Sequence, residues 1–248
     1  MSEKRLEKIY NGLLVFAICN LLVLFVIYRN PDFRINLDSL VAYKNLLLKG
    51  YGLTIGISFI SLIVSLIWGM ILFLMSISKR LFLKYCYEVY TQVALGVPLI
   101  VHVIVIYFFF ISATGIDNEI LAGILILSGY MSAYFAKTFQ GAYESIEEQQ
   151  FKIMHILGLP KNVQMRKIIM PQIITNTLPA LTSNFSLLVK STALLSLIAV
   201  PEFTNYINAY NSKSLEFVTG YVMLAVGYLV ITVPLGYLAK WMNKKVVG

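Results

Sequence analysis

Charged side chains are scarce in this sequence. They make up 13% of its 248 residues, whereas an ordinary globular domain carries about a quarter. Hydrophobic residues make up 58%, which leaves too few polar side chains to cover a water-facing surface. The composition therefore argues against a soluble domain, provided that the apolar residues form runs able to cross the roughly 30 Å of a bilayer's hydrocarbon core.

Catalytic and metal-binding side chains are also scarce. The two cysteines, Cys19 and Cys86, fall in a predicted span and in a predicted cytoplasmic segment, so a disulfide is not expected. The two histidines, His102 and His155, are far apart, which leaves no metal or nucleophile constellation and predicts neither an enzyme nor a cofactor. No G-x-x-x-x-G-K-[ST] phosphate loop occurs, so any ATP must be bound by another protein.

Long apolar runs are what the sequence does contain. They lie at about 11–28, 50–77, 94–112, 120–141, 178–200 and 217–239. The first run follows basic residues, as in a signal peptide, but the exit VIYRNPDF lacks a small-residue cleavage pattern. The sequence therefore predicts an all-α membrane protein with a bundle of about six transmembrane helices, the first of them retained.

The basic residues predict the orientation. If the N-terminus is cytoplasmic, thirteen of the twenty Lys and Arg residues fall on the cytoplasmic side and five on the other. The remaining two, Lys137 and Lys190, lie in or beside predicted spans. We therefore expect a multi-pass protein of the bacterial inner membrane with both termini in the cytoplasm. Its positive charge meets anionic lipid headgroups, and its dispersed basic residues do not predict nucleic-acid binding.

The predicted cytoplasmic segment between residues 140 and 176 is long and has its own pattern. Its sequence SIEEQQFKIMHILGL mixes apolar and charged residues as an amphipathic helix does, and Gly158 with Pro160 would end that helix. A second short helix is predicted through NVQMRKII to Pro171. These two helices would form a protruding knob. It is either a docking surface for a cytoplasmic partner or an interfacial helix on lipid headgroups.

Three segments carry the motif spacing of one known family. Gly158 is followed after nine residues by Ile168 and then by Pro171. Further segments read LGVPLIVHVIVIYF and LPALTSNFSLLVKSTALLSLIAVPEF, the latter with Lys190 and Glu202 at family positions. Over about residues 46–240 the chain thus resembles the permease subunits of the polar amino-acid branch of ABC importers.

The resemblance implies an assembly. Two permease subunits would work with a cytoplasmic ABC ATPase dimer and an extracytoplasmic amino-acid-binding protein, and residues from about Gln150 to Pro160 would form the coupling helix that docks into the ATPase. It also implies a division into an extra N-terminal helix with its tail and loop (1–45), a permease domain (46–240, coupling loop at about 141–176) and a cytoplasmic tail (241–248). The coupling residues so implied are Gln150, Phe151, Lys152, His155, Gly158, Leu159 and Pro160.

Several residues depart from the family pattern. Lys152 stands where the family has the Glu of its E-A-A triplet, and Lys137 and Gln140 replace a Glu and an Arg. We therefore expect this subunit to pair with a different, more regular permease. Lys137 either faces the translocation path or extends to the membrane–water interface. His102 is either a histidine with its hydrogen bonds satisfied in the interior or a functional ligand. The predicted pathway residues are His102, Tyr134, Lys137, Gln140 and Lys190.

A pair of glycines and the lack of acidic residues in the predicted spans carry further expectations. Gly52 and Gly56 form a G-x-x-x-G motif, which predicts close helix packing. The alternative to an importer is a secondary transporter or channel without ATPase subunits, and a scaffold without transport activity is a third class. The predicted spans hold no Asp or Glu, which argues against an ion-coupled carrier without excluding one.

Overall fold

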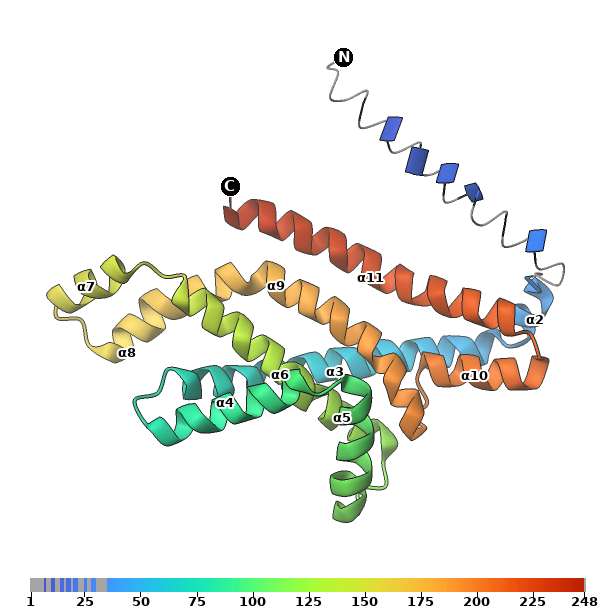
Figure 1. Ribbon diagram of the computed structural model, residues 1–248, viewed down its shortest axis with the longest axis horizontal. Helices are drawn as coiled ribbons and strands as arrows, with labels where there is room; N and C mark the ends of the chain where they lie inside the picture. Colours follow the sequence, from blue (N-terminus) through green and yellow to red (C-terminus); the bar gives the residue numbers. More distant parts are fainter. Residues whose placement is uncertain are drawn as a thin grey trace.

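The computed structural model describes residues 35–247, with side chains to residue 244, and separate positions between residues 7 and 29 (Figure 1). The predicted span 11–28 therefore falls largely outside the described residues, as does Cys19. The described part is helical and contains no strand, which confirms the all-α prediction.

The described elements follow one another in this order: α2 (Leu37–Ala42), α3 (Lys44–Ser76), α4 (Leu81–Gly96), α5 (Leu99–Val105), the π-helical turn η1 (Ile106–Ile111), the 3₁₀ turn η2 (Ser112–Thr114), α6 (Glu119–Glu144), α7 (Glu148–Ile156), α8 (Lys161–Val163), the π-helical turn η3 (Gln164–Ile169), α9 (Met170–Ser191), the 3₁₀ turn η4 (Thr192–Ile198), α10 (Phe203–Ser214) and α11 (Phe217–Val247). Long helices run side by side along the molecule, with α3 packed most extensively on α6 and α9 on α11 (Figure 1).

Four helical stretches are long and apolar enough to cross a membrane. They are Lys44–Ser76, Glu119–Glu144, Lys161–Ile198 and Phe217–Lys244, and the bent pair α4–α5 qualifies as a fifth. These stretches correspond to five of the six predicted spans. The last begins at the first residue of its predicted run, and the others begin before theirs. The membrane fold read from the sequence is confirmed for this part of the chain.

A sharp bend near its start interrupts the predicted span 94–112. Helix α4 packs against α3, and the chain then bends by 109° between Gly96 and Leu99 (Figure 1). Pro98 causes the break, because its ring keeps the preceding Val97 in an extended conformation (φ −98°, ψ 130°). Cys86 lies on helix α4, where it is half-buried.

The predicted short helix ending at Pro171 is wrong. A single helical stretch runs from Lys161 to Ile198 and passes through Pro171 without a stop. The π-helical turn η3 comes directly before α9, in whose first turn Pro171 lies. A missing N–H is tolerated in the first turn of a helix, and the wider π turn accommodates the change of hydrogen-bonding pattern.

Small residues allow α3 and α6 to approach closely. Ser61, Ser65 and Gly69 are buried along one side of α3, and the Ser128 hydroxyl of α6 donates to the Ser61 carbonyl oxygen over 3.3 Å. A Cβ atom added to Gly69 would lie 2.8 Å from the Cβ of Phe135. This is the close packing that small residues give in membrane helices.

The glycine motif that predicted such packing does not take part in it. A Cβ atom on Gly52 or Gly56 would meet no atom of the described chain within 4 Å. The contact is instead made two to three turns further along α3, where serine supplies the small side chain. The prediction placed close packing at the wrong position because it considered glycine alone.

The bundle has two distinct ends. At the α10 end, α2, α10 and the start of α11 meet around Leu47, Phe203, Ile207 and Tyr210. At the α7 end, α7 and α8 protrude beyond the ends of α3 and α6 (Figure 1).

Candidate coupling surface and translocation pathway

Helix α7 is anchored to the bundle by its inner face. Met154 is 3% exposed and packs in the same cluster as Ile169 and Ile173 of the η3–α9 stretch. The Phe151 ring lies 5.6 Å from the ring of Tyr143, which closes the last turn of α6. An amphipathic helix buries its apolar stripe in this way, so α7 is packed on both α6 and α9.

Gly158 ends α7 as the sequence predicts. Its N–H donates to the His155 carbonyl over 3.0 Å, and the N–H of Leu159 donates to the Met154 carbonyl over 3.2 Å. These two bonds form a Schellman motif, whose glycine adopts a left-handed conformation, here with φ +65°. Leu159 packs in the cluster that holds Met154, which is the hydrophobic contact that accompanies such a motif.

The outer face of α7 is apolar and exposed. Ile153, Ile156 and Leu157 are 55%, 81% and 66% exposed, although each is a large hydrophobic side chain. Lys152 and Glu148 form an ion pair of 3.1 Å beside them. Exposed apolar patches of this kind mark interaction sites. We call Lys152, Ile153, His155, Ile156 and Leu157 the docking face.

The predicted coupling residues divide between this face and the interior. Phe151 and Leu159 pack inward, and Gln150 accepts a hydrogen bond of 3.1 Å from Gln172 of α9. Lys152 and His155 lie on the docking face, whereas Ile153 and Ile156 were missed by the sequence reading. The excess of apolar residues in so short a helix could have revealed them, because they cannot all share one buried stripe.

His102 and Tyr134 are joined by an aromatic ladder. The His102 ring, half-buried on α5, meets the ring of Tyr130 edge-on at 5.5 Å, and the rings of Tyr130 and Tyr134 are also 5.5 Å apart. The two tyrosine hydroxyls lie 3.2 Å from each other. One turn further along α6, Thr138 accepts a hydrogen bond of 3.0 Å from Asn184 of α9. Polar groups thus follow one side of α6 toward the α7 end.

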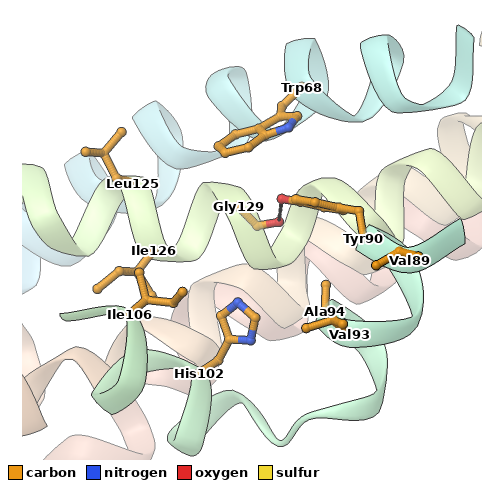
Figure 2. Close-up of a pocket in the computed structure, with 10 residues that line it drawn as sticks. All are labelled: Trp68, Val89, Tyr90, Val93, Ala94, His102, Ile106, Leu125, Ile126 and Gly129. Carbon is orange, nitrogen blue, oxygen red and sulfur yellow. Dashed lines mark hydrogen bonds between the residues drawn. The ribbon is translucent and has the colours of Figure 1, made fainter. Parts of the chain in front are cut away.

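A cavity of about 360 Å³ opens beside His102 (Figure 2). Trp68 of α3 and Val93 of α4 line it together with residues of α5 and α6. The hydroxyl of Tyr90 donates to the carbonyl oxygen of Gly129 over 2.7 Å at its edge. The lining is otherwise apolar, so His102 stands between an apolar cavity and the tyrosine ladder.

Lys137 and Gln140 form a separate group nearer the α7 end. The Lys137 Nζ lies 3.4 Å from Gln140 Oε1 and 5.0 Å from the centre of the Tyr87 ring on α4. Lys190 is exposed in the last turn of α9, and in the described part of the chain no hydrogen bond joins it to either group. The structure thus brings the predicted residues together as two pairs and one single residue.

The sequence and the fold are both similar to known transport proteins. The family model of the binding-protein-dependent transport system inner membrane component matches residues 61–248. The probable amino-acid ABC transporter permease protein YckA of Bacillus subtilis is 31% identical over 74% of this chain and 81% of its own length. The arginine ABC transporter permease protein ArtQ of Haemophilus influenzae is 30% identical over 73% of this chain and 84% of its own.

Two solved structures share the fold. A crystal structure of an amino acid ABC transporter with histidines matches with a TM-score of 0.79 at 25% identity, over 86% of this chain and 99% of its own. An inward-facing MetNI methionine ABC transporter matches with a TM-score of 0.65 at 16% identity, over 81% and 98%. The second likeness shows the fold alone.

These findings confirm the resemblance read from the three motif segments. The family consists of multi-pass inner-membrane subunits that work with a substrate-binding protein and an ATPase, so ATP hydrolysis belongs to a separate subunit and this chain is not an enzyme. Because its model matches most of the sequence, the chain belongs to the family of the binding-protein-dependent transport system inner membrane component.

Proposed function

We propose that this chain is the permease subunit of an ATP-driven importer for a polar amino acid. The observation that carries the proposal is the docking face, an exposed apolar tip on a protein without a nucleotide-binding motif of its own. A tip of this kind suits an ATPase partner. The amino-acid permeases among the relatives support the substrate class.

Coupling runs through α7 in this proposal. Residues from Gln150 to Pro160 dock into the ATPase, with Ile153, Ile156 and Leu157 making the apolar contact and Lys152 at its rim. Phe151 then transmits movement to α6 through Tyr143, and Gln150 transmits it to α9 through Gln172. Gly158, Leu159 and Pro160 hold the turn that positions the helix. One displacement of α7 thereby moves two membrane helices.

The substrate pathway follows the polar side of α6. His102 and Tyr134 offer a ring and a hydroxyl, and Lys137, Gln140 and Lys190 offer ammonium and amide groups that can meet a substrate carboxylate. Because these groups lie in two pairs and one single residue, the substrate would pass them in succession. Lys190 and Lys137 are exposed and can serve the half of the pathway that a second permease completes.

The proposed topology places both termini and the α7 end in the cytoplasm. Residues 1–45 add one membrane helix to a permease domain of residues 46–240, and residues 241–248 form a short tail. The second permease is a different chain, because Lys137 and Gln140 replace the charged family residues in this one. An extracytoplasmic binding protein delivers the amino acid.

Purification in mild detergent, with identification of every co-purifying chain, tests the assembly. We expect an ATPase and a second permease. Reconstituted vesicles should then take up the amino acid only with ATP, and Gly158→Arg should abolish uptake while leaving membrane insertion intact. Uptake that survives Gly158→Arg and persists in ATP-depleted vesicles under an ion gradient would contradict the proposal.

A further inference from the structure

A second cavity, of about 400 Å³, lies at the α7 end and is lined mainly by polar side chains. It forms where three helix ends meet. Ser76 and Ile77 come from the end of α3, Lys84 and Glu88 from the first two turns of α4, and Gln140 with Glu144 from the end of α6. Its volume falls in the range of roughly 300–1,000 Å³ that small-molecule sites occupy.

The cavity carries charges of both signs. Lys84, Glu88 and Glu144 line it, and Lys137 stands at its edge through its contact with Gln140. In the described part of the chain the sole ion pair joins Lys152 and Glu148, so none of these four charges is paired with another. One ammonium group and two carboxylate groups therefore line one space without neutralising each other directly, and the Lys137 ammonium stands at its edge.

Hydrogen bonds hold the wall of the cavity in place. The Tyr87 hydroxyl donates to Gln140 Oε1, and Gln140 Nε2 donates to Glu144 Oε1 over 2.8 Å. Gln140 is thereby fixed between α4 and its own helix. Because only one oxygen of Glu144 is used, its carboxylate remains able to accept from a ligand ammonium.

The same wall touches the coupling helix. Tyr143 lines the cavity, and its ring also lies 5.9 Å from Phe73 and 5.6 Å from Phe151 of α7. A molecule that fills the cavity would therefore press on the side chain that anchors α7. The Tyr143 ring thus connects the cavity with Phe151 and, through it, with the docking face.

We propose that this cavity binds a free zwitterionic amino acid from the cytoplasm and so slows transport when the product accumulates. The ligand's carboxylate meets Lys84 and its ammonium meets Glu144 and Glu88. A purely anionic ligand would face two lining carboxylates and a single lining ammonium group, which disfavours it, whereas a zwitterion offers an opposite charge to both kinds of group. The inference rests on the proposed function, which places the α7 end in the cytoplasm and gives amino acids as the class of ligand.

The test uses the assembled importer in vesicles of phosphatidylcholine and phosphatidylglycerol, with ATP inside and the loaded binding protein outside. L-Glutamine is the probe, because its side chain is neutral and only its backbone charges are tested. Millimolar L-glutamine inside should lower the initial rate of ATP hydrolysis about fivefold or more, as allosteric coupling does. N-acetyl-L-glutamine and L-glutamine amide, which each lack one charge, should have no effect.

Two variants assign the effect to the cavity. Lys84→Met and Glu144→Gln should remove the inhibition. The rate of ATP hydrolysis in vesicles without internal L-glutamine should stay unchanged. Lys79→Met and Glu119→Gln make the same charge changes outside the cavity and should retain the inhibition. Inhibition that persists in both cavity variants, or that N-acetyl-L-glutamine reproduces, would overturn the proposal.

Direct binding separates this inference from the proposed function. The purified wild-type complex should bind L-glutamine in calorimetry, and Lys84→Met should weaken that binding at least about tenfold, the loss of one charged contact. If the loaded binding protein does not raise the rate of ATP hydrolysis, the proposed function fails. The calorimetric measurement still shows whether the cavity binds L-glutamine. If adding phosphatidylethanolamine abolishes L-glutamine binding, the occupant is a lipid headgroup and the inference is wrong.

Discussion

The two ends of the bundle treat their polar groups in opposite ways. At the α10 end Glu202 is fully buried, and its carboxylate accepts hydrogen bonds from the Asn205 N–H (2.9 Å), the Tyr228 hydroxyl (3.0 Å) and the Thr54 hydroxyl (3.3 Å). At the α7 end Glu144 is exposed beside charges that it does not pair with. The Glu202 carboxylate is enclosed by donors of the protein itself, whereas the Glu144 carboxylate is left accessible.

The difference indicates what each end does. The Glu202 network joins α3, α10 and α11, so a change there should cost stability. At the α7 end the apolar residues of the docking face are exposed, so changes to that face should cost activity more than stability. Paired substitutions at the two ends can break or sharpen this comparison.

The largest effect is expected from Ile156→Asp at the docking face. Burying a carboxylate in an apolar contact should lower binding-protein-stimulated ATP hydrolysis about 30-fold, as the loss of a hot spot of roughly 2 kcal/mol does. Leu215→Asp is the matched control, because Leu215 is 74% exposed at the α10 end. Co-purification of the ATPase gives the second readout. Equal losses in both variants would remove the distinction between the ends.

The next effect is expected from Glu202→Ala, measured by thermal unfolding in detergent. Three donors would lose their buried acceptor, which costs about 3 kcal/mol and should lower Tm by about 6 °C or more. Glu202→Gln should cost about half as much, since an amide still accepts. Glu144→Ala at the α7 end should stay within about 0.5 kcal/mol. A smaller loss for Glu202→Ala than for Glu144→Ala would reverse the comparison.

The sequence predicted what depends on local pattern. Apolar runs give spans because a helix must match the thickness of the bilayer, and Gly158 gives a cap because a left-handed turn favours glycine. The bend at Pro98 was missed because α4 carries Lys84 and Glu88 and does not read as an apolar run. The cavity between α4 and α6 could not be predicted from the sequence, because its side chains are more than fifty residues apart and are brought together only by the packing of the two helices.

The smallest effects are expected at two turns with the same backbone geometry. Gly158 at the α7 end and Ala199 at the α10 end both adopt left-handed conformations, with φ +65° and +60°, and both close a helical stretch through bonds of the Schellman type. Such a conformation costs a residue with a Cβ atom about 1 kcal/mol. Gly158→Ala should therefore lower the free energy of unfolding by about that amount, because a Cβ atom there meets open space and adds only backbone strain.

Ala199→Gly should raise the free energy of unfolding by somewhat less than Gly158→Ala lowers it. Relief of strain at Ala199 is partly offset by the greater backbone freedom that glycine has in the unfolded chain. Thermal unfolding of both variants beside the wild type measures the two shifts. Shifts of the same sign would mean that backbone conformation does not govern these turns. Gly158→Ala should also lower binding-protein-stimulated ATP hydrolysis, because Gly158 holds the docking face in position. Ala199→Gly should not lower that rate, because Ala199 lies at the opposite end.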